Sequence, residues 1–174
     1  MPPRLATPRT TSRLTDGGLG AFVGHLHRRP WLPWQRHAAD VVGERLPGGR
    51  YAYPTVVVLV PRQCGKTTFV FDLATGRGLE YADYRGAYCA QTGHVTTERF
   101  GERMAELATT PLDRITRTRK SAGTERITLR RGSYVKAFPP KDGALRSSAL
   151  DLVDVDREAD RGVYSETNLW MRHL

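Results

Sequence analysis

The sequence predicts an α/β fold with a mainly parallel central sheet, because two predicted strands are each followed by a predicted helix. Residues 55–60 (TVVVLV) form an uncharged run of β-branched and aliphatic residues, which is typical of a strand buried on both faces. Pro61 ends this strand because it has no N–H to donate, and apolar residues at helical spacing follow from Phe69. Residues 86–91 (GAYCAQ) predict a second strand, and residues 95–108 predict a helix. The core residues expected in that helix are Phe100, Met104 and Leu107.

Between the first strand and its helix lies the loop of residues 62–68, RQCGKTT. Backbone N–H groups at such a loop and helix N-terminus can bind phosphate oxygens, and Gly65 lets the backbone approach them closely. Lys66 would supply charge to the β- and γ-phosphates of ATP, and the Thr67 hydroxyl would coordinate Mg²⁺. The common motif has a first glycine at the position of Val60, so a chance Gly-Lys-Thr at an ordinary helix remains the alternative. The fold class we expect is a P-loop NTPase, a three-layer sandwich with helices on both faces of the sheet.

The composition points to a single α/β domain with a polyanionic partner. The chain has 174 residues and a net charge of +9, and residues 111–148 carry ten basic against three acidic side chains. A basic block in a nucleotide-binding chain favours nucleic acid as the partner, and a solvated basic surface is the alternative. No apolar run approaches the length of a membrane span. Cys64 and Cys89 are interpreted as the reduced thiols of a cytosolic protein.

The first part of the chain is predicted to be an arm followed by helices. Residues 1–14 are rich in proline, threonine and arginine, which predicts a mobile arm. An amphipathic helix is expected from Asp16, and we take residues 1–29 as a unit separate from the ATPase domain of residues 30–174. The apolar stripe expected on this helix is Leu19, Phe22, Val23 and Leu26.

Two aromatic residues and a glutamine precede the phosphate loop in the sequence Trp31-Leu32-Pro33-Trp34-Gln35. Gln35 could read the donor and acceptor edge of adenine while Trp34 covers the ring. A Trp/Pro anchor that only packs the second predicted helix, which begins near Gln35, is an equally good interpretation.

The basic block divides into a polar stretch and a hairpin. Residues 113–120 (DRITRTRK) are too polar for the core and concentrate four positive charges. Residues 127–129 and 134–138 predict two strands around the turn Arg130-Arg131-Gly132-Ser133, a β-hairpin with a basic tip.

Residues 149–159 (ALDLVDVDREA) predict a second buried strand that ends in acidic residues. In P-loop ATPases such a strand supplies an Asp for Mg²⁺, and a nearby Glu polarises the attacking water. We assign Asp156 to the metal and Glu158 to the water, with Asp154 open as the alternative because the register is ambiguous. A solvated acidic strand end without catalytic function is the other interpretation.

Four segments, in the same order as in the family, resemble the N-terminal ATPase domain of the large terminase subunit of tailed bacteriophages. They are Leu32-Pro33-Trp34-Gln35, residues 61–68, Tyr88-Cys89-Ala90-Gln91-Thr92, and the approach from Leu145-Arg146 to Asp156. The second resembles the family's variant P-loop, which lacks the first glycine and carries an early arginine, here Arg62. Two features depart from the family pattern: Arg157 separates the paired acids, and no nuclease domain follows.

The resemblance implies a Mg²⁺-dependent ATPase motor that packages double-stranded DNA into proheads, working in the host cytoplasm and transiently at the prohead portal. ATP would be bound by Trp34, Gln35, Arg62, Gln63, Cys64, Gly65, Lys66, Thr67 and Thr68. The catalytic residues would be Glu158, Arg62 and Lys66, and the Mg²⁺ ligands Thr67 and Asp156. Implied partners are the portal protein, the small terminase subunit and further copies in a ring. A helicase-like DNA-dependent ATPase and a truncated nucleotide-binding module with little hydrolysis are the alternatives.

Overall fold

The structure is a computed structural model that describes residues 6–121, 123–138, 140, 149–158 and 164–171. For residues 156–158, 164–168, 170 and 171 it describes the backbone only. The helices are α1 (Gly18–Leu26), α2 (Pro33–Val42), α3 (Lys66–Glu80), α4 (Gly93–Leu107) and the short 3₁₀ helix η1 (Pro111–Ile115). The strands are β1 (Thr55–Pro61), β2 (Arg85–Cys89), β3 (Arg117–Arg119), β4 (Arg126–Thr128), β5 (Tyr134–Ala137), β6 (Leu152–Glu158) and β7 (Tyr164–Met171). An α/β architecture is thereby confirmed.

The sheet has seven strands in the order β1-β7-β6-β2-β5-β4-β3, and it is mixed where we expected it to be mainly parallel. Among the described strands, β2 makes parallel pairs with β5 and β6, and the other neighbours are antiparallel. The physical reason is the length of the connections, because parallel neighbours need a long crossover and short connections join antiparallel strands. The connection from β6 to β7 is short, and β7 lies between β6 and β1.

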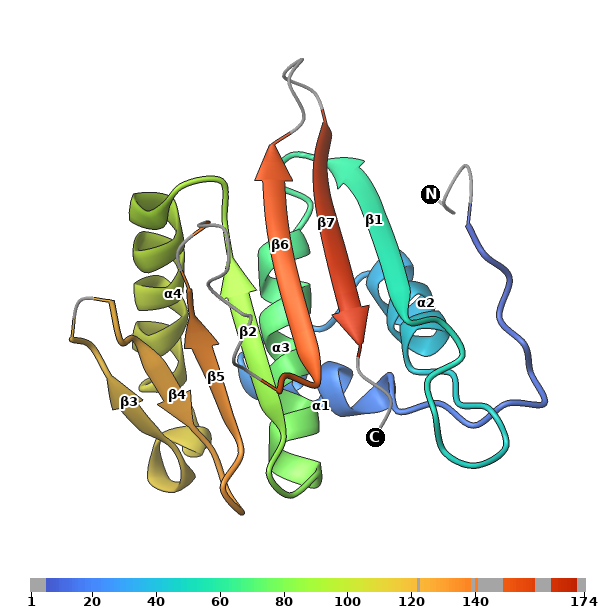
Figure 1. Cartoon of the computed structure of the whole chain (residues 1–174), viewed down its shortest axis with the longest axis horizontal. Coiled ribbons are helices and arrows are strands. Elements are labelled where there is room, and N and C mark those ends of the chain that lie inside the picture. Colours follow the sequence, from blue (N-terminus) through green and yellow to red (C-terminus); the bar gives the residue numbers. More distant parts are fainter. Residues whose placement is uncertain (1–5, 122, 139, 141–148, 159–163, 172–174) are drawn as a thin grey trace.

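The helices of the described part of the chain lie together behind the sheet in Figure 1, on one face. The exposure of β1 agrees with this arrangement, since Val58 is buried whereas Val57 and Leu59 on the opposite face are 57% and 60% exposed. The described residues therefore form two layers, and they do not include the second helical layer of the expected three-layer sandwich.

The core lies between the helices and the sheet, and α3 is its centre. Phe69, Leu73 and Ala74 of α3 are buried with Val23 of α1, so both helices belong to one core. Glycines let the two helices approach, because a Cβ on Gly20 would lie 2.8 Å from the Leu73 Cα atom.

The apolar stripe predicted for α1 is wrong at Phe22, which is 59% exposed. Gly20, Val23 and Gly24 are the buried residues of this helix. Because α1 packs closely on the backbone of α3, the buried face of α1 is the one that contains Gly20 and Gly24.

The predicted mobile arm is anchored over its described residues. The Glu44 carboxylate, whose side chain is fully buried, accepts hydrogen bonds from the Thr10 N–H (2.6 Å) and the Arg13 guanidinium (3.0 Å). These contacts hold the arm against the end of α2.

The other predicted elements are confirmed in position, but the prediction that residues 55–60 are buried on both faces is wrong, because β1 is the edge strand of the sheet and only one of its faces is covered by helices. Strand β1 and helix α3 flank the loop of residues 62–65, β2 and α4 follow in order, and Phe100, Met104 and Leu107 are buried in α4. The predicted hairpin forms from β4 and β5. No helix among the described residues is long and apolar enough to cross a membrane.

Candidate phosphate-binding site

The loop between β1 and α3 has the backbone geometry of an anion-binding nest. Gln63 and Gly65 adopt left-handed conformations, with φ of 60° and 80°, and Cys64 between them does not. Gly65 is left-handed and is followed directly by Lys66, the first helical residue of α3, and such a pair turns successive N–H groups toward one concave side, where they can bind an anion. A non-glycine residue at positive φ is uncommon, and Gln63 shares this conformation with Arg28, Asp83 and Arg131 among the described residues.

The carbonyl oxygen of Gly65 is held by three donors. They are the Gln35 amide Nε2 at 2.9 Å, the Thr68 hydroxyl at 2.8 Å and the Phe69 N–H at 3.0 Å. A Cβ at Gly65 would lie 3.1 Å from the Gln35 Nε2 atom and 3.3 Å from the Thr68 Oγ1 atom. Close packing and the positive φ together favour glycine at this position.

Lys66 and Thr67 begin α3 directly after the nest. Lys66 is 5% exposed, and Thr67 is half-buried. The helix N-terminus adds a positive dipole end with N–H groups that α3 does not use internally. These residues fit a bound triphosphate: the nest and Lys66 would hold its oxygens, and Thr67 would offer a hydroxyl to Mg²⁺.

Gln35 lies in the site, but its amide is engaged by protein groups. It is 5% exposed, its Oε1 accepts from the Leu32 N–H at 2.7 Å, and its Nε2 donates to the Gly65 carbonyl. The side chain thus links the segment before α2 to the phosphate loop.

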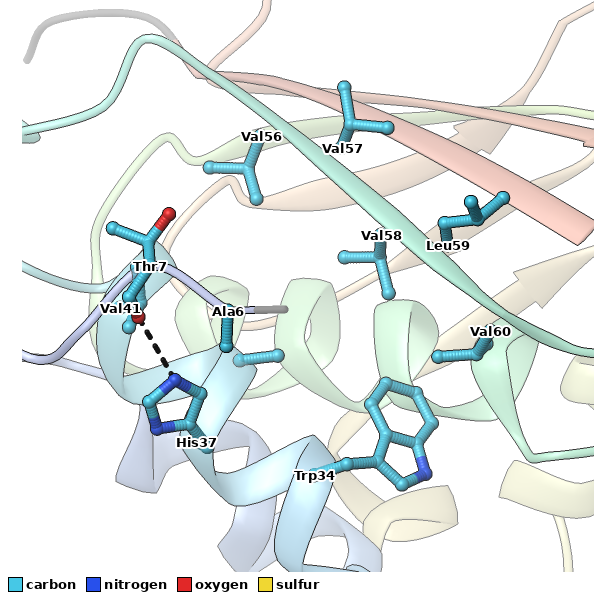
Figure 2. A pocket seen from close by; sticks show the side chains of 11 residues that line it. Ala6, Thr7, Trp34, His37, Val41, Val56, Val57, Val58, Leu59 and Val60 are labelled. Carbon is cyan, nitrogen blue, oxygen red and sulfur yellow. Dashed lines mark hydrogen bonds between the residues drawn. The ribbon is translucent and has the colours of Figure 1, made fainter. Parts of the chain in front are cut away.

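Trp34 packs against the first turn of α3 and against β1. Its ring lies 5.6 Å from that of Phe69, and it lines a cavity of about 140 Å³ between α2 and β1 (Figure 2). In Figure 2, Val56, Val58 and Val60 point from β1 toward this cavity, whereas Val57 and Leu59 point away. The contacts of Trp34 therefore agree with the packing interpretation of the Trp/Pro segment.

A second cavity, of about 210 Å³, adjoins the phosphate loop. Its walls come from the segment before α2, the loop and the first turns of α3. The lining residues are Arg29–Leu32, Gln35, Gln63–Gly65, Thr68 and Asp72. This cavity is next to the nest and is the better candidate for the non-phosphate part of a nucleotide.

Asp72, which sequence reasoning missed, places a buried carboxyl in this second cavity. It is 2% exposed, and it accepts a hydrogen bond from the Trp31 indole N–H at 2.9 Å. Burial raises the pKa of Asp72 to about 6, against the stabilising effects of the Trp31 hydrogen bond and the Arg29 charge. One signal was available in the sequence, an acid within the apolar run of residues 69–74.

The register of β6 orders the three acids relative to the phosphate loop. Glu158 and Val60 both lie opposite Ser165 of β7, whereas Asp154 and Val56 lie opposite Leu169. The carboxyl ends of β1 and β6 lie at the same edge of the sheet (Figure 1), so Asp156 is about 7 Å nearer to that edge than Asp154.

Asp154 is 1% exposed, so the interpretation as a solvated acidic strand end does not apply to this residue. The side chains of Asp156 and Glu158, like Leu145 and Arg146, are outside the residues or atoms that the structure describes. Among the described residues, no group of three or more His, Cys, Asp and Glu side chains could hold a metal ion.

The basic residues gather at the opposite end of the sheet from β1. Arg119, Arg126 and Lys136 lie opposite one another on β3, β4 and β5 and line a cavity of about 340 Å³. The Arg126 guanidinium lies 3.8 Å from the centre of the Tyr134 ring. Residues 113–120 are exposed apart from Thr116, as predicted for a surface stretch. The sequence pattern did not identify Arg126 and Lys136 as members of this basic surface.

One arginine of the predicted basic hairpin tip makes a hydrogen bond within the fold. Arg131 donates to the Glu80 carbonyl at the end of α3 at 3.1 Å, and Arg130 is exposed.

Comparison of the chain with protein-family models, with curated proteins and with solved structures finds no match. The functional argument therefore depends on the residues and geometry of the site.

Proposed function

We propose that the chain is the ATP-binding and hydrolysing motor domain of a viral DNA-packaging terminase. The observation that carries the ATPase part is the nest at Gln63–Gly65, placed between strand β1 and the N-terminus of α3 with Lys66 as its first residue. The terminase part rests on the four segments that resemble that family. The further helices of a three-layer P-loop fold would cover the open face of the sheet.

In this proposal the loop amides and Lys66 bind the β- and γ-phosphates, and Arg62 contacts the γ-phosphate. Thr67 and Asp156 would hold Mg²⁺, which when bound neutralises charge on the phosphates. Glu158 orients the attacking water and accepts its proton. Asp156 lies nearer than Asp154 to the edge of the sheet at which the loop leaves β1, and this supports Asp156 over Asp154.

Nucleotide titration of a Lys66→Ala variant tests the proposal. Removal of the ammonium group should abolish ATP·Mg²⁺ binding or turnover, as measured by calorimetry and phosphate release, while the far-ultraviolet circular dichroism remains that of the parent. A variant that hydrolyses ATP like the parent would refute the phosphate-loop assignment.

The acids are tested separately. Glu158→Gln should retain ATP·Mg²⁺ binding and stop hydrolysis, and Asp156→Ala should weaken the Mg²⁺-dependent part of binding. If Asp154→Ala weakens that part and Asp156→Ala does not, Asp154 is the metal ligand.

Double-stranded DNA is the proposed partner of the basic end of the sheet, together with the portal protein, the small terminase subunit and other copies of the chain in a ring. The row formed by Arg119, Arg126 and Lys136 supports an anionic partner, because these three basic residues line one cavity against a single acidic residue, Glu125. A helicase-like ATPase is the second candidate, since it would share the loop and the DNA surface. Stimulation of ATP turnover by DNA alone favours either motor over a nucleotide-binding module, which would show little turnover.

A further inference from the structure

Gln35 connects two segments that are distant in the sequence, and both hydrogen bonds fix the orientation of its amide. The Leu32 N–H is a donor and therefore requires the Gln35 Oε1, at 2.7 Å. The Gly65 carbonyl is an acceptor and therefore requires the Nε2, at 2.9 Å. The assignment of oxygen and nitrogen follows from the partners.

Holding the Gly65 carbonyl also orients the next amide. The peptide bond between Gly65 and Lys66 is planar and trans, so its C=O and N–H point in opposite directions. Gln35, Thr68 and the first turn of α3 hold the carbonyl on one side, which directs the Lys66 N–H to the other.

Reading a base would require the Gln35 amide either to leave these partners or to use its second N–H and its second oxygen lone pair, and the side chain is only 5% exposed. An adenine edge needs one acceptor and one donor from the amide, and these are the atoms engaged by Leu32 and Gly65. With the side chain buried, breaking either bond would leave a buried polar group without its present partner, at a cost in binding energy.

We propose that Gln35 is a positioning residue for triphosphate binding and that it does not read the base. This inference rests on the proposed function, since it concerns the same loop. It predicts that Gln35 affects affinity for the triphosphate group itself, whatever base is attached.

The test compares ATP, GTP and inorganic tripolyphosphate, each with Mg²⁺, by calorimetric titration of the full chain. Gln35→Glu keeps the acceptor for the Leu32 N–H and replaces the donor to Gly65 by an oxygen. Loss of one orienting hydrogen bond should weaken all three ligands by a similar factor, about tenfold. Arg36→Ala, an exposed neighbour in α2, is the matched control and should bind all three like the parent.

Protonation provides a rescue that a general packing defect would not show. Below its pKa the introduced carboxyl can again donate to the Gly65 carbonyl, so the difference in affinity from the parent at the same pH should shrink. Gln35→Met, of similar length and without charge, is the second variant if the first does not fold, and it should also weaken all three ligands equally.

Two results would overturn the inference. One is a changed ratio of ATP to GTP affinity with tripolyphosphate binding intact, which would make Gln35 a base reader. The other is unchanged binding of all three ligands by folded variants. If the parent itself binds none of the three, the proposed function fails, and this outcome is distinct from both.

Discussion

At the residue scale, the left-handed backbone of Gly65 limits which side chain the phosphate loop accepts. Gly65→Ala should destabilise the fold by about 1–2 kcal/mol, since an L-residue is strained at this φ and the added Cβ would crowd Gln35 and Thr68. Urea denaturation measures the change.

Gly101→Ala is the control for the Gly65 substitution. Gly101 lies inside α4, and a Cβ there meets nothing within 4 Å. The Gly101→Ala substitution should stabilise the protein by about 0.5–1 kcal/mol, because alanine favours a helix more than glycine does. Effects of opposite sign are therefore expected from one chemical change, and destabilisation of equal size by both would contradict the backbone argument.

The buried carboxyl of Asp72 should make stability depend on pH. Its pKa rises from an ordinary 3.8 to about 6 in the folded chain, chiefly through burial. The folded state holds the proton more tightly, so this contribution to stability is complete below pH 3.8 and is lost as the pH rises toward 6.

Replacement by asparagine, which keeps an oxygen for the Trp31 indole, removes this dependence. The stability of Asp72→Asn relative to the parent should increase between about pH 4 and pH 6, by up to about 3 kcal/mol, and stay constant above. The nearby ionisable groups His27, Arg29, Arg103 and Glu106 are present in both proteins, so the comparison reports the titration of Asp72 together with its charge interactions with these groups. A flat difference across this range in denaturation experiments would refute the raised pKa.

At the element scale, strand β3 and its flanks present the basic side chains that would contact DNA phosphates. Arg117, Arg119 and Lys120 are exposed, and replacing all three by alanine should weaken duplex binding equally across sequences. The slope of log affinity against log salt should flatten by about one unit for each phosphate that the variant no longer neutralises.

A control with the same change in charge removes three other exposed arginines, Arg28, Arg36 and Arg50, which lie outside β3 to β5. The control variant should retain more of the salt dependence of DNA affinity than the variant of Arg117, Arg119 and Lys120. Titration of assembled protein with duplex at several salt concentrations measures both. An unchanged slope in the first variant would make the basic row a solvated surface.

At the scale of the whole molecule, the described part of the chain has helices on one face of the sheet and leaves the other face without helices (Figure 1). Val57 and Leu59 are more than half exposed on β1, which is the outer strand of the sheet. Exposed apolar edge strands tend to associate with other chains.

Leu59→Lys should therefore reduce concentration-dependent self-association in sedimentation velocity, with a change in the free energy of unfolding of less than about 0.5 kcal/mol. Phe22→Lys, at an equally exposed site on α1, is the control and should not reduce it. Equal effects of the two substitutions would mean that general hydrophobicity, and not the β1 edge, drives association.

The elements that sequence reasoning predicted correctly are those encoded by neighbouring residues. The uncharged run of residues 55–60 specifies a strand, although not its exposure at the edge of the sheet, and the loop and helix that follow it place Gly65 and Lys66 together without help from the rest of the chain. Periodic apolar residues likewise predicted α4, and the turn residues around Gly132 predicted the β4–β5 hairpin.

The tertiary structure alone decided which distant segments meet. Strand β7 enters the sheet between β1 and β6, the Gln35 amide reaches the Gly65 carbonyl, and Arg126 lies between Arg119 and Lys136. A local pattern carries no information on strand order, on register or on which partner satisfies a buried amide, because each depends on packing among residues far apart in the chain. The sequence by itself thus determined the strand, the loop proposed to bind phosphate and the helix that follows, whereas the fold determined how that loop is held.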